Sequence, residues 1–221
     1  ANLRAGQTVG VDGQVLGLAA WRGLSAALAP VGIALDIQAD LLEDIWADRP
    51  GLPSAPVYEH QPPQAVESRA ERLARVRDAM DQYGADAHLV CTVDDIAWIF
   101  NLRGADVEYN PVFLAHLLIS PDGAELFVGE GKVDAALAAR LAADGVQCRP
   151  YEQALPALSK LRASDADTVL WLDPKRTTWG LREAVPEGVR VIEATNPSTL
   201  AKSRKTDAEA SFIREAMEAD G

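Results

Sequence analysis

The sequence predicts an α/β protein in which helices flank a mixed β-sheet and a smaller, partial α/β unit comes first. Apolar runs of strand length alternate with amphipathic stretches of helix length along most of the 221 residues. One turn signal, SPDG, separates two apolar runs inside this alternation, and a hairpin at such a place makes the sheet mixed rather than purely parallel. A proline-rich stretch divides the pattern, which predicts two units joined by a linker.

Residues 1–50 are predicted to form a first, small α/β unit. Strands are expected at TVGVDG and over residues 33–37, with a helix over residues 18–32 between them and a short helix over residues 40–50. Asp40 is the expected N-cap of the short helix, which ends before Pro50 because proline disfavours helical backbone in the residue preceding it. We expect this unit to be incomplete, because a few short elements cannot bury a full hydrophobic core.

Residues 51–64 are predicted to be an extended linker, because five prolines fall between positions 50 and 63. The second α/β domain is expected over residues 65–200. It begins with a helix over residues 65–83 whose apolar face carries Leu73, Val76, Met80 and Tyr83. Strands are then expected at AHLVC, VFLAHLLIS, AELFVG, TVLWLD and VRVIEA. Helices are expected at TVDDIAWIFN, GKVDAALAARLAADG, EQALPALSKLRA and near TTWGLREAV.

Residues 201–221 are predicted to be a further linker and the first helix of another domain. Thr206 and Glu209 have the spacing of a capping box. Phe212, Ile213 and Met217 give the helix an apolar stripe, yet no sequence follows for the stripe to pack against. We therefore expect the natural protein to continue beyond this segment.

Composition excludes several classes of function. The chain is 48% hydrophobic and 24% charged, with a formal net charge of -12, which argues against nucleic acid as a partner. No apolar stretch is long enough to cross a membrane, and the N-terminal residues lack the features of a signal peptide. Cys91 and Cys148 form no metal-binding or redox motif, so we expect buried thiols in a reducing cytoplasm.

The sequence contains no recognisable catalytic motif. Glycine-rich phosphate loops, HExxH, GxSxG and CxxC are all missing. His88 and His116 lie in apolar strand runs and are expected to be structural, whereas His60 lies in the linker and is expected to be solvated. Asp106, Glu108 and His116 do not have the spacing of a metal site, so no metal is expected in this segment. The tryptophans expected on buried faces are Trp46, Trp98, Trp171 and Trp179.

The loop NLRGADVEYNP, residues 101–111, is unusually polar for a connector between two apolar runs. Its polar residues are Arg103, Asp106, Glu108, Tyr109 and Asn110. Such a loop is either a turn that satisfies its own hydrogen bonds or the rim of a binding site.

The stretch DDIAWIFNLRGADVEYNPVFLAHLLI resembles a segment of the cytosolic, three-domain aminopeptidases P, which are Xaa-Pro aminopeptidases of the creatinase/prolidase superfamily. DLLEDIWADRP is similar to the end of that family's first domain, and ALSKLRASDADTVLWLDPKRTTWGL is similar to the later part of its second domain. LAKSRKTDAEASFIREAMEADG resembles its entry into the catalytic domain. The resemblance therefore covers nearly the whole chain, and it implies a creatinase N-terminal-type fold for the second domain.

In that family a downstream pita-bread domain performs the reaction. Two aspartates, a histidine and two glutamates there hold two divalent metal ions, usually manganese, that activate a water molecule. The resemblance implies that this segment lacks those ligands and is inactive alone, while its parent is a cytoplasmic peptidase acting on short proline-containing peptides. It also implies that the partner of this segment is the parent's own catalytic domain, with a homodimer possible in the full-length protein.

The family's amino-terminal domains restrict access to the catalytic cleft, so Arg103, Asp106, Tyr109 and Asn110 are candidate rim residues. Arg103 could pair with a substrate or catalytic-domain carboxylate, and Asp106 could orient Arg103 or receive a peptide amine. In the alternative interpretation Arg103 and Asp106 tie the loop to itself and Gly104 supplies a positive φ.

Two other functions remain open for the whole chain. One is an acidic protein-interaction module of a catalytically inactive pita-bread homologue, which the net negative charge would suit. The other is a small-molecule-binding α/β domain, which the missing glycine-rich turn disfavours. Sequence beyond Gly221 discriminates the first of these from a peptidase, because only a peptidase retains the five metal ligands.

Overall fold

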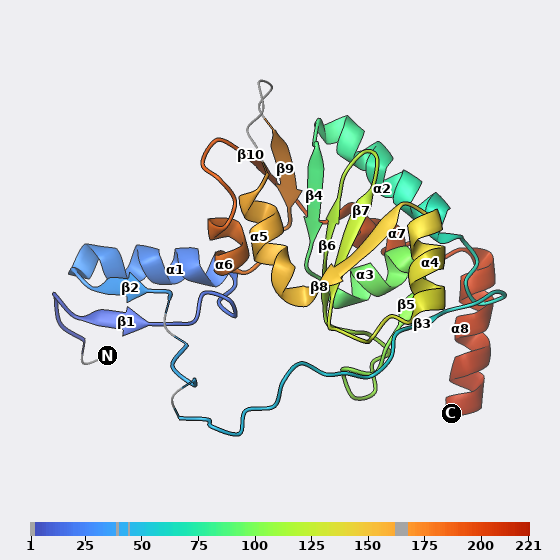
Figure 1. Ribbon diagram of the computed structural model, residues 1–221, viewed down its shortest axis with the longest axis horizontal. Coiled ribbons are helices and arrows are strands. Elements are labelled where there is room, and N and C mark those ends of the chain that lie inside the picture. The colour runs from blue at the N-terminus through green and yellow to red at the C-terminus, as the bar shows by residue number, and fades with distance from the viewer. Residues whose placement is uncertain (1–2, 39, 44, 162–167) are drawn as a thin grey trace.

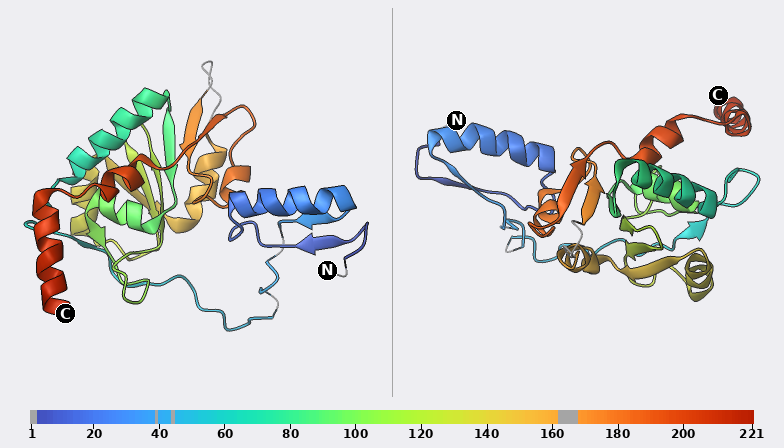
Figure 2. Two further views of the ribbon diagram at one scale, coloured as in Figure 1. Left: turned by 180° about the vertical axis from the view of Figure 1, so that it is seen from behind. Right: turned by 90° about the horizontal axis from the view of Figure 1, so that it is seen from above.

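A computed structural model describes residues 3–38, 40–43, 45–161 and 168–221 of the chain (Figure 1). Its largest part is a six-stranded sheet with helices on both faces. A small unit formed by β1 (Thr8–Gly10), α1 (Leu18–Leu28) and β2 (Ala34–Asp36) projects from one side. The C-terminal helix α8 (Asp207–Asp220) stands apart from the sheet at the other side (Figures 1 and 2).

The six-stranded sheet is mixed, as the hairpin signal predicts. Its strand order is β10-β9-β4-β6-β7-β8. Strands β6 and β7 form the antiparallel hairpin, and β6 also runs antiparallel to β4, whereas the pairs β10–β9, β9–β4 and β7–β8 are parallel. The strands are β4 (Ala87–Val90), β6 (Ala115–Ile119), β7 (Ala124–Val128), β8 (Val146–Pro150), β9 (Val169–Leu172) and β10 (Arg190–Glu193).

Two buried apolar clusters lie on opposite faces of this sheet, because the side chains of a strand alternate between its faces. One face is covered by α2 (Arg69–Tyr83), α3 (Val93–Phe100) and α4 (Ala135–Ala143). The other is covered by α5 (Ala154–Ser159) and α6 (Trp179–Glu183). The short helix α7 (Pro197–Ser203) lies beside α2 and α3 (Figure 2).

Helix α2 begins four residues later than the sequence predicts. Ser68 is its N-cap, and its hydroxyl accepts a hydrogen bond from the backbone N–H of Glu71 while the Glu71 carboxylate accepts one from the backbone N–H of Ser68. This reciprocal capping box fixes the first turn. Gly84 ends the helix in the left-handed conformation, with φ 61°, as expected for a glycine at this position.

The helix expected over residues 40–50 is absent from the residues described there, which form turns. Asp40 does accept a hydrogen bond from the backbone N–H of Leu42, at 3.0 Å. The apolar side chains of this stretch remain exposed: Leu41, Leu42, Ile45 and Trp46. A helix this short is unstable without a surface to pack against, which explains the difference.

The small unit is joined to the sheet domain by a packed contact as well as by the covalent linker. Leu18 is fully buried in the apolar cluster that α5 and α6 cover. The rings of Trp21 and Trp179 stack with their centroids 3.5 Å apart, and Arg22 forms two hydrogen bonds with the Glu193 carboxylate. The contact therefore combines apolar burial with a bidentate ion pair.

The tryptophans differ in burial more than the sequence predicts. Trp171 is buried and Trp46 is 44% exposed, so the expectation for Trp46 is wrong. Trp98 is only partly buried, and Trp179 is partly buried in its stack with Trp21. Among the described residues, no helix has both the length and the apolar character needed to cross a bilayer.

Candidate functional site

The loop over residues 101–111 begins directly after α3. Asn101 ends that helix in the left-handed conformation, with φ 51°, which asparagine tolerates better than most residues. Its side-chain oxygen accepts a hydrogen bond from Arg72, and its amide nitrogen donates to the carbonyl oxygen of Glu67. The start of the loop is thus fixed to the first turn of α2.

The next two residues form the short strand β5 (Leu102–Arg103), which pairs antiparallel with β3 (Tyr58–Glu59). The linker therefore contributes a strand and is not only a spacer. His60 continues this contact by donating its backbone N–H to the carbonyl oxygen of Asn101, at 2.7 Å. The linker and the loop consequently hold each other in place.

Arg103 is half-buried and has no carboxylate within ion-pair distance among the residues that the structure describes. Its Nη1 atom donates to the carbonyl oxygens of Ala97, at 3.2 Å, and Leu102, at 2.9 Å. Burial lowers the pKa of the guanidinium from its ordinary value, although an arginine remains charged at neutral pH. Arg103 is thus a cation without a carboxylate partner in the part of the chain that the structure describes.

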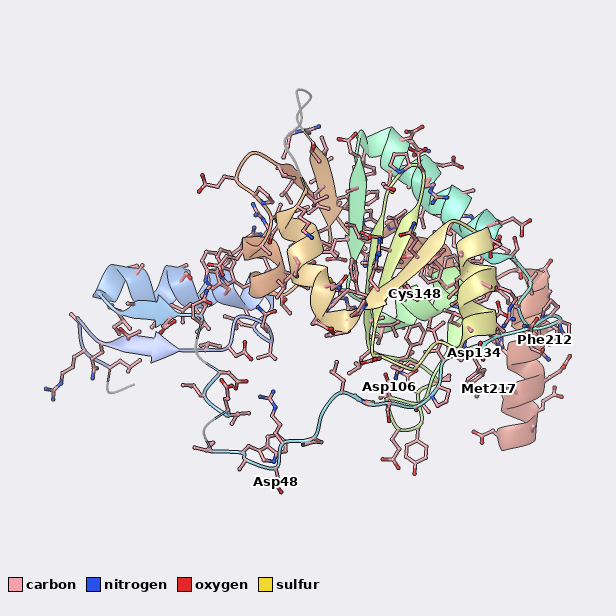
Figure 3. All side chains as sticks on the ribbon, in the orientation of Figure 1. Asp48, Asp106, Asp134, Cys148, Phe212 and Met217 are labelled. Carbon is pink, nitrogen blue, oxygen red and sulfur yellow. The ribbon has the colours of Figure 1, made fainter. Side chains whose placement is uncertain are left out.

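Asp106 does not orient Arg103. Its side chain is fully buried and forms an ion pair with Lys132, whose own side chain is 1% exposed. The second carboxylate oxygen accepts from the backbone N–H of Leu114, at 2.7 Å, and the Lys132 ammonium also donates to the carbonyl oxygen of Pro53, at 3.2 Å. The pair joins the loop, the linker and the turn after β7, which is why Asp106 lies inward beside the linker (Figure 3).

Gly104 is required for space and not for a positive φ. Its φ lies outside the left-handed region, and an added Cβ would lie 2.7 Å from the Cβ of Phe113 and 3.1 Å from the carbonyl oxygen of Val112. The interpretation that Gly104 supplies a positive φ is therefore wrong. The left-handed residues of the loop are Asn101 and Tyr109.

Tyr109 and Asn110 form the exposed tip of the loop. A tight turn places the backbone N–H of Asn110 3.2 Å from the carbonyl oxygen of Val107. Tyr109 has φ 59° and its side chain is 98% exposed. A left-handed conformation is unfavourable for a bulky residue, so the chain holds this aromatic ring outward at some cost in energy.

Sequence reasoning missed two residues that support the loop, Lys132 and Arg72. Arg72 is buried beneath Trp98, with its guanidinium carbon 4.3 Å from the ring centroid, and it donates to the carbonyl oxygen of Trp98 at 2.5 Å. Lys132 reaches the loop from 26 residues away in the sequence. Neither belongs to a local motif, because both act through contacts that only the tertiary fold creates.

His88 and His116 have the structural surroundings that apolar strand runs predict. The Nδ1 atom of His88 donates to the carbonyl oxygen of Trp171, at 3.1 Å, and burial lowers the pKa of His88 to about 4. The ring of His116 lies against that of Tyr151 in a tilted arrangement, and burial lowers the pKa of His116 to about 4 as well. His60 is partly buried, and its pKa is lowered by burial and by nearby Arg103.

Neither cysteine has the lowered pKa that makes a thiol reactive. Burial raises the pKa of Cys91 to about 12 and also raises the pKa of Cys148, so both thiols are protonated at neutral pH. Within the described ranges, no group of three or more histidine, cysteine or acidic side chains has the geometry to hold a metal ion. The arrangement around residues 101–111 offers neither a nucleophile nor a metal cage.

Comparison with known families identifies the class of protein to which this fold belongs. The family model of the creatinase/prolidase N-terminal domain matches residues 48–209. The chain belongs to this family.

Two of the relatives found by sequence have the same name. A protein from Arthroderma gypseum named Probable Xaa-Pro aminopeptidase P is 34% identical over 98% of this chain and 35% of its own length. A protein of the same name from Fusarium vanettenii is 31% identical over 98% of this chain and 37% of its own length. The chain thus spans a little over a third of the length of these curated relatives.

The crystal structure of X-prolyl aminopeptidase from Caenorhabditis elegans, described as a cytosolic enzyme with a di-nuclear active site, has the same fold. Its TM-score is 0.87 at 24% identity, over 97% of this chain and 35% of that one. The similarity extends beyond the six-stranded sheet, because 97% of this chain includes the small N-terminal unit and α8.

Proposed function

We propose that this chain is the non-catalytic N-terminal portion of a metal-dependent Xaa-Pro aminopeptidase, an enzyme that removes the first residue of peptides with proline in second position. The observation that carries the proposal is the name shared by relatives 31–34% identical over 98% of this chain. The chemistry would belong to a further portion of the parent, where two divalent metal ions, with manganese as the expected metal, would supply an activated water.

The proposed role of this portion is to wall the catalytic cleft and to limit it to short peptides. Three features of the 101–111 loop support this role: Arg103 lacks a carboxylate partner among the described residues, Tyr109 is held outward in a left-handed conformation, and the buried Asp106–Lys132 pair anchors the loop. A rim must keep its shape without substrate, and the pairing of β3 with β5 and a buried ion pair provide that rigidity.

The domain boundaries predicted from the sequence belong to this proposal. Residues 1–50 would be the rear of the first domain and residues 51–64 its linker. Residues 65–200 would be the second domain, and residues 201–221 would lead into the catalytic domain. We place the parent in the cytoplasm and propose that it forms a homodimer. The partner of this portion is the parent's own catalytic domain, and the parent acts on short proline-containing peptides.

The first test is activity of the parent protein. Purified with Mn²⁺, it should cleave an Xaa-Pro peptide, and removal of the metal with a chelator should abolish cleavage. A parent that neither binds Mn²⁺ nor cleaves Xaa-Pro peptides would instead support an acidic interaction module.

The second test concerns the rim. In the parent, Arg103→Ala should lower kcat/KM for an Xaa-Pro dipeptide by about 10- to 150-fold, because a hydrogen bond to a charged group contributes about 1.5–3 kcal/mol. Arg149→Ala is the matched control, since Arg149 forms a surface ion pair with Glu125 on the edge of the sheet. A change below about twofold in Arg103→Ala, together with a loss of stability, would leave the loop with a structural role only.

A further inference from the structure

Asp95, in the first turn of α3, is a buried carboxylate to which the proposed function gives no role. It is 1% exposed, and its Oδ2 atom accepts hydrogen bonds from the hydroxyl groups of Thr92 and Thr199, each at 2.7 Å. Its Oδ1 atom forms an ion pair with the Lys202 ammonium, at 2.8 Å. Burial by itself would raise the pKa of Asp95, but the donated hydrogen bonds, that of Lys202 first among them, outweigh burial and lower it. The carboxylate is therefore ionised and is stabilised by donors of the protein rather than by water.

Thr92 and Asp95 have the spacing of a capping box but do not form one. In α2 and α8 the two residues at this spacing accept hydrogen bonds from each other's backbone N–H groups. The Thr92 side chain makes no capping hydrogen bond, and its hydroxyl donates to the Asp95 carboxylate instead. The N-terminus of α3 thus lacks the usual local stabilisation. Departures of this kind from a local rule are expected where a side chain has another role.

The partners of Asp95 show that this role is to hold α7. Asn196, the N-cap of α7, donates its side-chain amide to the Oδ2 atom of Asp95, at 3.3 Å. Thr199 lies in the middle of the helix and Lys202 in its last turn. Asn196 and Ser198 are both 0% exposed, so the start of α7 is packed against the domain. One carboxylate therefore fixes α7 from its N-cap to its last turn, and α7 lies beside α3 as a result (Figure 2).

Helix α3 connects two regions that have different roles in the proposed enzyme. Its C-terminal end leads directly into the 101–111 loop, and its N-terminal end holds α7 through Asp95. Apolar side chains between these ends are fully buried: Ile96, Ile99 and Phe100. The helix is therefore closely packed over its length of about 12 Å. Since residues 204–206 alone separate α7 from α8, α7 sets the direction in which the chain leaves the sheet domain.

We propose that Asp95 is a positioning residue of the peptidase, which fixes α7 to α3 and thereby sets the place of the catalytic portion relative to the 101–111 loop. The inference rests on the proposed function, because it concerns how the loop that would bind substrate is placed against the metal ions that would act on it. Asp95 is too deeply buried to touch substrate and acts through α7. Groups that bind a substrate must be held within about 0.5 Å of the productive geometry, so a rigid joint is required between them.

Steady-state kinetics of the parent, purified with Mn²⁺, test this role. Asp95→Asn keeps the size of the side chain and removes the charge that binds Lys202. It should raise KM for an Xaa-Pro dipeptide by about tenfold and leave kcat within about threefold, because the loop is misplaced while the residues around the metal ions are unchanged. An unchanged KM, or a fall in kcat alone, would overturn the proposal.

Asp94→Asn is the matched control for these measurements. Asp94 is the preceding residue and pairs with the same Lys202 ammonium, but its side chain is 56% exposed. An exposed ion pair contributes little, so KM should change by less than about twofold. An equal rise of KM in Asp94→Asn and Asp95→Asn would show that the charge of Lys202 matters and that the buried carboxylate has no special role, which would also overturn the proposal.

A double variant separates positioning from stability. Asp95→Asn should also destabilise the parent, because the Lys202 ammonium loses its buried partner. Adding Lys202→Met removes this charge and should return the denaturant midpoint of unfolding toward that of the wild-type parent. KM should nevertheless stay high, because the ion pair that fixed α7 is still missing. If stability and KM recovered together, the role of Asp95 would be structural only.

Hydrogen exchange of the amides of residues 198–203 measures the joint without any activity. They should exchange about tenfold faster in Asp95→Asn than in Asp94→Asn, while β4 and β6 exchange equally in both. Equal exchange of α7, or faster exchange of all elements alike, would overturn the inference. A wild-type parent that leaves Xaa-Pro peptides uncut would overturn the proposed function. A wild-type parent that cleaves them, with the same KM in Asp95→Asn, would overturn this inference alone.

Discussion

Asp106 and Lys132 form an ion pair from which water is excluded, with side chains 0% and 1% exposed. Lys132→Met leaves the carboxylate buried without its cation, so we expect the free energy of unfolding to fall by about 3–5 kcal/mol. Adding Asp106→Asn should restore most of this loss, because the buried charge is then gone and only a neutral amide remains. Denaturant unfolding of the single and double variants measures the difference.

The exposed ion pair between Arg149 and Glu125 is the control for that experiment. Its side chains are 45% and 35% exposed, so Arg149→Ala should change stability by no more than about 1 kcal/mol. If the double variant were as unstable as Lys132→Met alone, lost packing of the lysine chain rather than an unpaired charge would be responsible.

His88 makes stability depend on pH. Its pKa is about 4 in the folded protein and about 6.5 in the unfolded chain. The unfolded state therefore binds more protons between these values, so the contribution is fully present above pH 6.5 and is lost as the pH falls toward 4. The loss should approach about 3 kcal/mol, and His116, with the same lowered pKa, adds in the same direction.

Unfolding free energies at a series of pH values between 7 and 4 measure this dependence. His88→Gln should flatten the curve because its side chain does not titrate. His60→Gln is the control, since the His60 side chain is only partly buried and should contribute less. An unchanged slope in His88→Gln would show that other groups titrate in this range.

At the scale of elements, the same capping box occurs on two helices with different burial. Ser68 caps α2, which buries Leu73, Val76 and Met80, whereas Thr206 caps α8, which has no buried residue. Ser68→Ala should therefore lower global stability by about 1 kcal/mol. Thr206→Ala should leave the global free energy of unfolding unchanged and accelerate amide hydrogen exchange within α8 alone.

Denaturant unfolding together with hydrogen exchange separates the two cases. If Thr206→Ala lowered global stability as much as Ser68→Ala, α8 would be part of the cooperative core despite its exposure.

Most elements of the sheet domain follow from local sequence signals. The run AHLVC, the SPDG turn and the apolar alternation of residues 112–128 predict β4, β6 and β7, and Gly84 ends α2 at the expected residue. The helix expected over residues 40–50 is not formed by the residues described there, because its apolar side chains have no surface to pack against. Local propensity favours a helix but does not supply a partner for it.

At the scale of the whole molecule, the small N-terminal unit depends on its contact with the sheet domain. A two-stranded sheet is only marginally stable by itself, and Leu18 of α1 is buried in the apolar cluster that α5 and α6 cover. Leu18→Ala should therefore lower stability by about 2–5 kcal/mol. Leu24→Ala, in the same helix at 37% exposure, should cost less than about 1 kcal/mol.

Limited proteolysis of the linker gives an independent measure of the same contact. Loss of the Leu18 contact should accelerate cleavage of the linker, because the unit it tethers would then detach more often. Equal cleavage rates for Leu18→Ala and Leu24→Ala would indicate that the Trp21–Trp179 stack and the Arg22–Glu193 pair hold the unit without Leu18.

The sequence by itself determined the α/β class, the mixed sheet, the proline-rich division and the unusual loop, because each depends on the order of neighbouring residues. Only the tertiary structure decided what the loop residues do. Asp106 is paired with Lys132 and not with Arg103, Gly104 is required by its contact with Phe113, and Arg103 is left without a carboxylate among the described residues. Burial and pairing join residues that are distant in the chain, and no local pattern encodes them.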